Sequence, residues 1–212
     1  RAPGARGAGL LRLRSQLANG RAGRLDQGRA PLRSLQLDLQ LDPSDWSRLQ
    51  LRQLDATLPG QGQLRATGQS SGGDGSELRL RLDGLDSREI DARWPALRAR
   101  GELRLQTRAA LSGDLLAQPL KLQGQLSGEL GGGPAAGAPR EAKNQPPLPL
   151  TVELQALLAP QSLQLQSLQL HSGPARLQAS AELALRKALS LDQGWSLKSE
   201  AQIQGLDPRR FV

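Results

Sequence analysis

Few residues of this chain have the types and spacing that chemistry requires. The only histidine, His171, precedes a Ser-Gly-Pro sequence, and the chain contains no cysteine. One histidine without cysteine cannot complete the usual ligand sets of zinc or other transition metals. We therefore expect His171 to be a solvated turn residue and not a catalytic or metal-binding group.

The acidic and glycine-rich segments also lack a recognisable site. Residues 83–91 (DGLDSREID) carry four acidic side chains, but without the spacing of a calcium-binding EF-hand loop. Residues 72–75 (GGDG) lack the Gly-Lys-Ser/Thr that completes a phosphate-binding loop, and no G-x-S-x-G nucleophile motif occurs. We expect no enzymatic activity, no cofactor and no metal.

The positive charge of the chain favours two kinds of partner. The chain carries 28 basic and 20 acidic residues, a net charge of +8, and residues 1–108 hold 19 arginines against 12 acids. Nucleic acid is one possible partner. However, the arginines alternate with leucines, and only Trp46, Trp94, Trp195 and Phe211 offer rings for base stacking. We expect an arginine-rich solvent face without nucleic-acid binding. The sequence does not decide whether this face binds an anionic membrane surface, which is the second kind of partner.

Leucine is nearly the only large apolar residue, with 45 copies against two valines and two isoleucines. Leucine favours helices, yet its spacing here is that of strands. Alternation of leucine with polar residues recurs along the chain. It is found at 34–41, 77–82, 102–105, 119–126, 177–185 and 195–203. Each segment is predicted to form a strand with one apolar and one polar face.

The alternation assigns individual residues to the two faces. The residues expected to line an apolar groove are Leu35, Leu37, Leu39, Leu41, Leu78, Leu80, Leu82, Leu163, Leu165, Leu183 and Leu185. The residues expected to face solvent include Gln36, Asp38, Gln40, Arg79 and Arg81. Turning the charged set inward would desolvate Asp38, Arg79 and Arg81 without evident partners, at a cost of several kcal/mol.

Twice the alternation slips by one residue. In residues 162–170 (SLQLQSLQL) the slip falls at Gln166–Ser167, and in residues 48–58 it falls at Arg52–Gln53. One extra residue in an alternating strand indicates a β-bulge. A tight corner between two strands is the alternative, but neither slip contains the glycine or proline typical of a corner.

Turn signals separate the strands, at 59–62, 71–76, 112–114 and 171–175. Asp86 or Ser87 is predicted to cap a short helical turn before Pro95. Residues 130–149 are rich in glycine, proline and alanine, which indicates a loop or linker. The chain thus divides into a first segment at 10–129, this linker, and a second, partial repeat at 150–212.

An internal repeat supports that division. Residues 48–68 match 162–181, and residues 81–90 match 202–211, with Gly-Leu-Asp corners in both copies of the second pair. Repetition of this kind implies growth by adding strands along one axis. We therefore predict an all-β fold: a long antiparallel sheet, repeat-like and bulged, curled into an open apolar groove. The ends of the sequence suggest a piece of something longer.

Residues 11–41, the Gly-Leu-Asp corners followed by SREI or PRRF, and residues 168–185 resemble the TamB family of proteobacterial envelope proteins, relatives of the AsmA group. The resemblance implies a β-taco, which is a long sheet curled around an apolar interior. It implies an internal periplasmic segment of a protein that an N-terminal helix anchors in the inner membrane. It also implies an outer-membrane barrel partner of the TamA type, contacted through parts that this chain lacks.

The resemblance implies phospholipid movement between the two membranes, with acyl chains in the groove. A smooth leucine surface agrees with that function, because an exposed apolar patch marks a binding surface. Two alternatives stay open. The chain could be a scaffold whose sheet edges assemble outer-membrane β-barrel proteins or autotransporters. An arginine-rich nucleic-acid module ranks last.

Overall fold

The fold is described from a computed structural model, which describes residues 9–71, 75–108, 118–131, 147–187 and 190–205. The strands are β1 (Leu11–Ala18), β2 (Ser34–Asp42), β3 (Asp45–Thr57), β4 (Gln63–Ser71), β5 (Ser76–Asp86), β6 (Leu97–Thr107), β7 (Leu120–Leu130), β8 (Leu148–Ala159), β9 (Ser162–Ser172), β10 (Ala175–Lys187) and β11 (Ser190–Gln204). Three short helical elements accompany them, namely η1 (Leu25–Gln27), η2 (Pro59–Gln61) and α1 (Ser87–Ile90).

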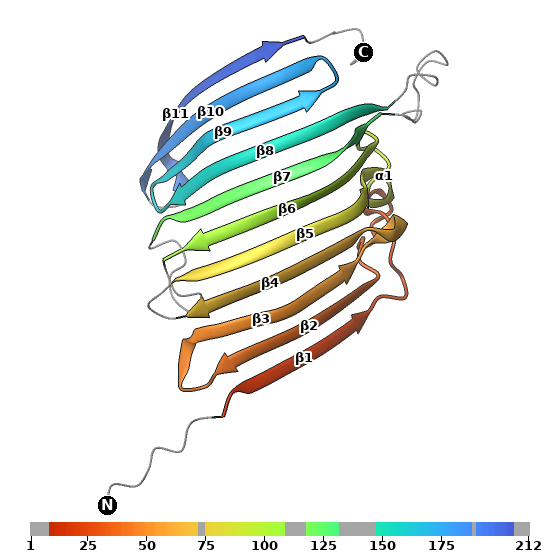
Figure 1. The fold of residues 1–212 in the computed structure, drawn as a ribbon, viewed down its shortest axis with the longest axis vertical. Coiled ribbons are helices and arrows are strands. Elements are labelled where there is room, and N and C mark those ends of the chain that lie inside the picture. Colours follow the sequence, from red (N-terminus) through yellow and green to blue (C-terminus); the bar gives the residue numbers. More distant parts are fainter. Residues whose placement is uncertain (1–8, 72–74, 109–117, 132–146, 188–189, 206–212) are drawn as a thin grey trace, which may run out of the picture.

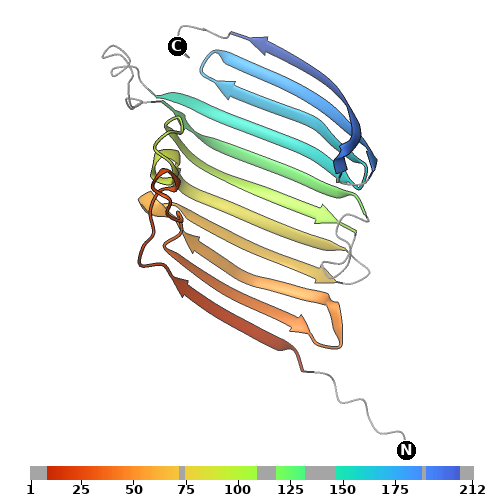
Figure 2. The same ribbon diagram turned by 180° about the vertical axis from the view of Figure 1, so that it is seen from behind.

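All eleven strands belong to one antiparallel sheet, and each strand pairs with its neighbours in the sequence. Figures 1 and 2 show the strands side by side in a single layer, with the short helices gathered at the strand ends. β1 and β11 lie at opposite ends of the sheet and do not pair with each other. The prediction of a long, open antiparallel sheet is confirmed.

Both predicted bulges are present. Ala156 of β8 pairs with Leu165 of β9, and Gln155 of β8 pairs with Ser167 of β9, so Gln166 is the extra residue of β9. In β3, Leu51 pairs with Leu39 and Gln53 with Asp38, so Arg52 is extra. The prediction of bulges instead of corners is correct, because the strands continue on both sides of each slip.

The first Gly-Leu-Asp sequence is also part of a strand. The pairing of β5 with β6 shifts between Leu82 and Leu85, and Gly84 there has a φ of 64°. This left-handed conformation is the one that glycine adopts without strain, so Gly84 makes a bulge and not a corner. Gly205, its counterpart in the second copy, has a φ of 65°. The two copies thus share a bulged strand, β3 in the first and β9 in the second, and a left-handed glycine, Gly84 and Gly205.

Parts of the sequence-based predictions concern residues outside the described ranges. These are most of the predicted 130–149 linker, the turn at 112–114, residues 72–74 of the 71–76 turn, and the end of the second repeat copy. β7 ends at Leu130 and β8 begins at Leu148, and these strands pair along their whole length. The sheet therefore continues across the predicted linker.

Glycines show which way the sheet curls. A Cβ atom added at Gly101 would lie 2.5 Å from the carbonyl oxygen of Gln125 and 3.1 Å from Cα of Leu126. At Gly128 it would lie 2.0 Å from the oxygen of Arg98. In a flat sheet, the Cα atoms of paired residues stay about 4.5–5.5 Å apart and Cβ atoms point clear of the neighbouring backbone. The neighbouring strand therefore leans towards the face on which these Cβ atoms would stand.

Three connections between strands, those that contain η1, η2 and α1, form a small folded cap at one end of the strands, where β5 meets β6. Asp86 caps α1 by accepting a hydrogen bond from the Arg88 backbone, as predicted. The buried hydroxyl of Ser87 donates to the carbonyl oxygen of Pro95 and accepts from the Leu97 backbone at 2.9 Å. These bonds fasten the loop at 91–96 to α1.

Asp91 is the most deeply buried side chain of this cap, with 1% of its surface exposed. Its carboxylate accepts hydrogen bonds from the Arg93 backbone at 3.0 Å and from the Arg93 guanidinium. This bonding, with a smaller contribution from the charge of Arg24, lowers the pKa of Asp91 to about 2. The cap also includes the loop that holds η1, since the Ala92 backbone donates to Asp26 at 3.4 Å.

We expect Asp91→Asn to destabilise the protein at neutral pH and much less in acid. A carboxyl with a lowered folded-state pKa stabilises the fold above its unfolded value, near 4, and this stabilisation is lost as the pH falls through about 2. Urea unfolding of both proteins at pH 7 and near pH 2.5 measures the difference. A gap between the two midpoints that stays constant with pH would contradict the assignment.

Candidate apolar binding face

One face of the sheet carries four rows of mostly apolar residues that cross all eleven strands; we call it the leucine face. The first row is Leu13, Leu39, Leu51, Gly68, Leu78, Leu105, Leu122, Ala156, Leu165, Ala181 and Ser199. The second is Ser15, Leu37, Leu54, Ala66, Leu80, Leu103, Gly124, Leu154, Leu168, Ala179 and Ala201.

The two outer rows flank these. The third row is Leu17, Leu35, Ala56, Leu64, Leu82, Gly101, Leu126, Val152, Leu170, Leu177 and Ile203. The fourth is Leu11, Leu41, Leu49, Ser70, Ser76, Thr107, Leu120, Leu158, Leu163, Leu183 and Leu197.

The structure places ten of the eleven leucines that alternation assigned to an apolar groove in these rows. The eleventh, Leu185, continues the alternation of β10 beyond Leu183 and pairs with Trp195 of β11. The bulges are what keep the set together: without them, Leu168 and Leu170 would lie on the opposite face from Leu163 and Leu165. All eleven residues therefore share one face.

Small residues interrupt each row. Ala56, Ala66 and Ala156 are almost fully buried, with exposed fractions of 4%, 5% and 9%, and each is paired with a leucine of the strand on either side. Gly68, Gly101, Gly124 and Gly128 also stand on this face, and the curl at Gly101 and Gly128 is towards it. The leucine face is thus the concave side of the curl where β6 and β7 pair.

No second layer of sheet or helix covers the leucine face in the described part of the chain. Most leucines of the inner strands are half-buried against one another, whereas those of the end strands are open. Leu11 and Leu13 on β1 are 53% and 49% exposed, and Leu197 and Ile203 on β11 are 55% and 58% exposed. The rows therefore form a continuous apolar surface, which is the kind of surface that binds partners.

The opposite face is polar, as predicted for Gln36, Asp38, Gln40, Arg79 and Arg81. Its charged residues are paired across and along the strands. Asp38 accepts hydrogen bonds from Arg12, Arg81 lies 3.0 Å from Asp83, and the Arg104 guanidinium lies 2.8 Å from Glu77. These bonds with arginine lower the pKa of Asp38 and of Glu77. The arginines of this face are thus largely neutralised by neighbouring acids.

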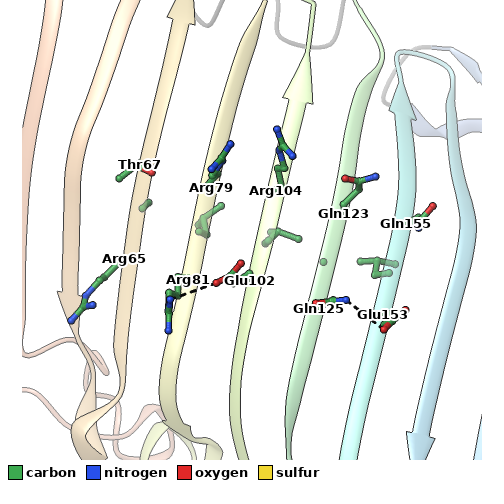
Figure 3. Close-up of a pocket in the computed structure, with 15 residues that line it drawn as sticks. Arg65, Thr67, Arg79, Arg81, Glu102, Arg104, Gln123, Gln125, Glu153 and Gln155 are labelled. Carbon is green, nitrogen blue, oxygen red and sulfur yellow. Dashed lines mark hydrogen bonds and ion pairs between the residues drawn. The ribbon is translucent and has the colours of Figure 1, made fainter.

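Figure 3 shows a hollow of about 650 Å³, which lies on this polar face over β4 to β8. Long side chains stand around it, among them Arg79, Arg104 and Gln155, while Arg81 pairs with Glu102, and Gln125 with Glu153. This hollow is the space between extended polar side chains on an open surface.

Other site types find little support in the described residues. Within the described ranges, no three side chains of the histidine, cysteine, aspartate or glutamate type gather closely enough to hold a metal ion. Among the same residues, no helix has the length and apolarity needed to cross a bilayer. The expectation that His171 is a turn residue is wrong: His171 lies in β9, where it pairs with Arg176 and Thr151, and the turn begins two residues later than predicted, at Gly173.

The sequence-based list missed part of the leucine face. Leu54, Leu103, Leu126, Leu154 and Leu168 belong to the same rows and lie in the middle of the sheet. Their strands alternate as clearly as the others, but glycine, alanine or a bulge shortens each run of leucines. The small residues themselves carry no signal in the sequence, because only the register shows that leucines of the neighbouring strands pair with them.

Comparisons with known proteins identify no relative. No family model matches the chain, and neither curated proteins nor solved structures gave a match. The molecule is therefore classed by its own geometry, as an open, curled all-β sheet with one apolar and one polar face.

Two single-residue deletions test the role of the β9 bulge. Deleting Gln166 turns the strand into SLQLSLQL, in which every leucine stays on the leucine face without a bulge. Deleting Gln164 removes the same residue type but moves Leu165 to the polar face and Gln166 to the leucine face. We expect the Gln164 deletion to cost about 2 kcal/mol more in unfolding free energy, measured with urea. Equal losses would show that the bulge does not set the facing of β9.

Proposed function

We propose that this chain is a segment of a conduit in which phospholipid acyl chains lie against the leucine face. One observation carries the proposal: four rows of mostly apolar residues cross all eleven strands on a face that no second layer covers in the described part of the chain. Burying a methylene group on such a surface contributes about 0.8 kcal/mol, so even part of a tail is held.

The dimensions and chemistry of the leucine face support an acyl chain that can move along it. With strands about 4.8 Å apart, ten intervals give rows of about 48 Å, roughly three times the ~15 Å depth of hydrocarbon in one leaflet. In the described part of the face, the polar members of the rows are small hydroxyl residues such as Ser15, Ser70 and Thr107. With no charged group on the rows, a tail is free to slide.

Lipid extraction followed by mass spectrometry tests the proposal on the purified chain. We expect phospholipid to co-purify, and fluorescent phospholipid to exchange between vesicles and the protein. A chain that is lipid-free after mild purification and takes up no labelled phospholipid contradicts it. The resemblance to the TamB family supports the rest of the proposal: a periplasmic location, an inner-membrane anchor and an outer-membrane barrel partner outside this chain.

A second candidate function rests on the two ends of the sheet. Among the described residues, β1 and β11 each have one strand edge without a partner, and such edges accept strands from other proteins. A scaffold for outer-membrane barrel proteins would use the backbone at these edges. It would therefore tolerate polar substitutions on the leucine face, which a lipid conduit would not. Crosslinking of a nascent barrel protein to β1 or β11 would favour this function.

A further inference from the structure

The arginines of the cap differ from those of the polar face, because several of them lack acidic partners. The connection between β1 and β2, residues 19–33, carries four arginines and one aspartate. Arg24 pairs with that aspartate, Asp26, at 3.2 Å. The other three arginines are exposed, and no carboxylate among the described residues pairs with their side chains; they are Arg21, Arg29 and Arg33. This connection therefore holds three uncompensated positive charges.

The rest of the cap does not offset this charge. The connection that contains α1, residues 87–96, carries two arginines and two acidic residues, so its charges cancel. The connection that contains η2, residues 58–62, has no charged residue. The cap as a whole thus keeps the positive charge of the β1–β2 connection.

Hydrogen bonds hold the β1–β2 connection in one conformation. The side chain of Asn19 donates to the carbonyl oxygen of Leu32 at 2.9 Å and accepts from the Arg21 backbone at 3.0 Å, so it joins the two ends of the loop. A Cβ atom added at Gly23 would lie 2.6 Å from Cδ of Arg29, so the stem of Arg29 packs against this glycine. An ordered loop loses less conformational entropy when it binds a partner.

Two large apolar side chains are exposed on the same cap. Leu25, in η1, is 45% exposed, and Trp94, in the loop after α1, is 46% exposed. The hydrogen bond from the Ala92 backbone to Asp26 joins the two loops close to these side chains. Figures 1 and 2 show the β1–β2 connection and α1 side by side at one end of the strands. The cap therefore exposes arginine and apolar side chains together.

An anionic bilayer surface matches this combination. Its phosphates attract arginines, each of which raises binding about fivefold near such a surface. Its interface accepts tryptophan and leucine side chains. Nucleic acid would attract the same arginines and would stack on Trp94, but it offers Leu25 no apolar partner.

We propose that the cap docks on an anionic phospholipid bilayer, with the β1–β2 connection against the phosphates and with Leu25 and Trp94 inserted at the interface. The proposal does not depend on what the leucine face binds, because the cap lies at the strand ends and contributes no residue to the four rows.

Sedimentation with vesicles measures the docking. Vesicles of equal parts phosphatidylcholine and phosphatidylglycerol are compared with vesicles of phosphatidylcholine alone. The ratio of the two affinities removes any lipid binding by the leucine face that does not depend on charge. We expect the parent chain to prefer the anionic vesicles, and this preference to fall as salt is added. Replacing Arg21, Arg29 and Arg33 with glutamine should lower the preference on the order of a hundredfold, since three fivefold contributions multiply.

Arg52→Gln, Arg65→Gln and Arg100→Gln together are the matched control. These exposed arginines lie on the polar face, and their replacement removes the same total charge. We expect this variant to keep the anionic preference, and circular dichroism checks that both variants are folded. The proposal is overturned by a parent chain without the preference, by equal losses in the two variants, or by a loop variant that loses binding to single-stranded DNA and not to vesicles.

The fluorescence of Trp94 tests its insertion without any change to the arginines. Trp46→Phe and Trp195→Phe together leave Trp94 as the only tryptophan of the chain. We expect its emission to shift to shorter wavelength with the anionic vesicles, and to be quenched by phospholipid brominated on the upper part of its acyl chains. A vesicle-bound chain in which Trp94 keeps the emission of a solvated ring overturns the proposal.

Discussion

Leu37→Arg is expected to lower the phospholipid that co-purifies with the chain by about tenfold, because it places a charge in the second row of the leucine face. An acyl chain that meets a guanidinium loses apolar contact and leaves the charge poorly solvated, which costs well above the ~1.4 kcal/mol of a tenfold change. The strand should stay paired, since its backbone hydrogen bonds do not involve the side chain. Lipid extraction with quantitative mass spectrometry measures the effect.

Gln36→Arg is the matched control. It introduces the same residue one position away on the same strand, but on the polar face, opposite Asp55 of β3. We expect its phospholipid content to equal that of the parent chain. Leu80→Arg and Gln40→Arg form a second such pair on different strands. If the arginines on the two faces reduced phospholipid equally, the leucine face would not be the binding surface.

The second large effect concerns the curl. Gly101→Ala is expected to lower the free energy of unfolding by about 1–3 kcal/mol, because its Cβ atom would lie 2.5 Å from a backbone oxygen of β7. The oxygen of Gln125 and Cα of Leu126 cannot move without shifting the whole strand. The change should flatten the sheet between β6 and β7, and urea unfolding measures its cost.

Gly124→Ala tests whether the clash or the loss of glycine matters. Gly124 also lies on the leucine face, but the atom nearest to an added Cβ is Cδ1 of Leu103, at 3.0 Å. This methyl group is the end of a flexible side chain and can rotate away. Alanine also restricts the unfolded chain, which offsets part of any strain. We expect a change below about 1 kcal/mol; a loss as large as that of Gly101→Ala would refute the role assigned to the curl.

The sequence predicted the two faces because alternation has a period of two and leucine is almost the only large apolar residue. In a strand of eight or nine residues such as β2, only one assignment of alternate side chains to the two faces keeps Asp38 in solvent. The bulges at Arg52 and Gln166 were predictable for the same reason, since each appears as one extra residue in the pattern. Asp86 was identifiable as a helix cap by its position before Ser87.

Other features depend on which strand segments lie opposite each other, and local pattern does not contain that information. The gaps that Gly101 and Gly128 leave for the neighbouring backbone appear only once β6 and β7 are in register. The same holds for Arg104 with Glu77, and for Asp26 with the backbone of Ala92, 66 positions along the chain. The pattern predicts a corner at Gly84, where the structure has a bulge, because glycine with a positive φ serves in both.

The bulges of β3 and β9 are six strands apart, a distance of about 29 Å along the rows. Each bulge bends its strand and increases the local twist, so the leucine face changes direction at β3 and β9, and also at the Gly84 bulge of β5. A bound molecule that crosses several strands must therefore bend to follow the surface. We expect the leucine face to discriminate by stiffness: single-chain hydrocarbons can conform to successive turns, whereas fused-ring lipids of similar size fit only between two bulges.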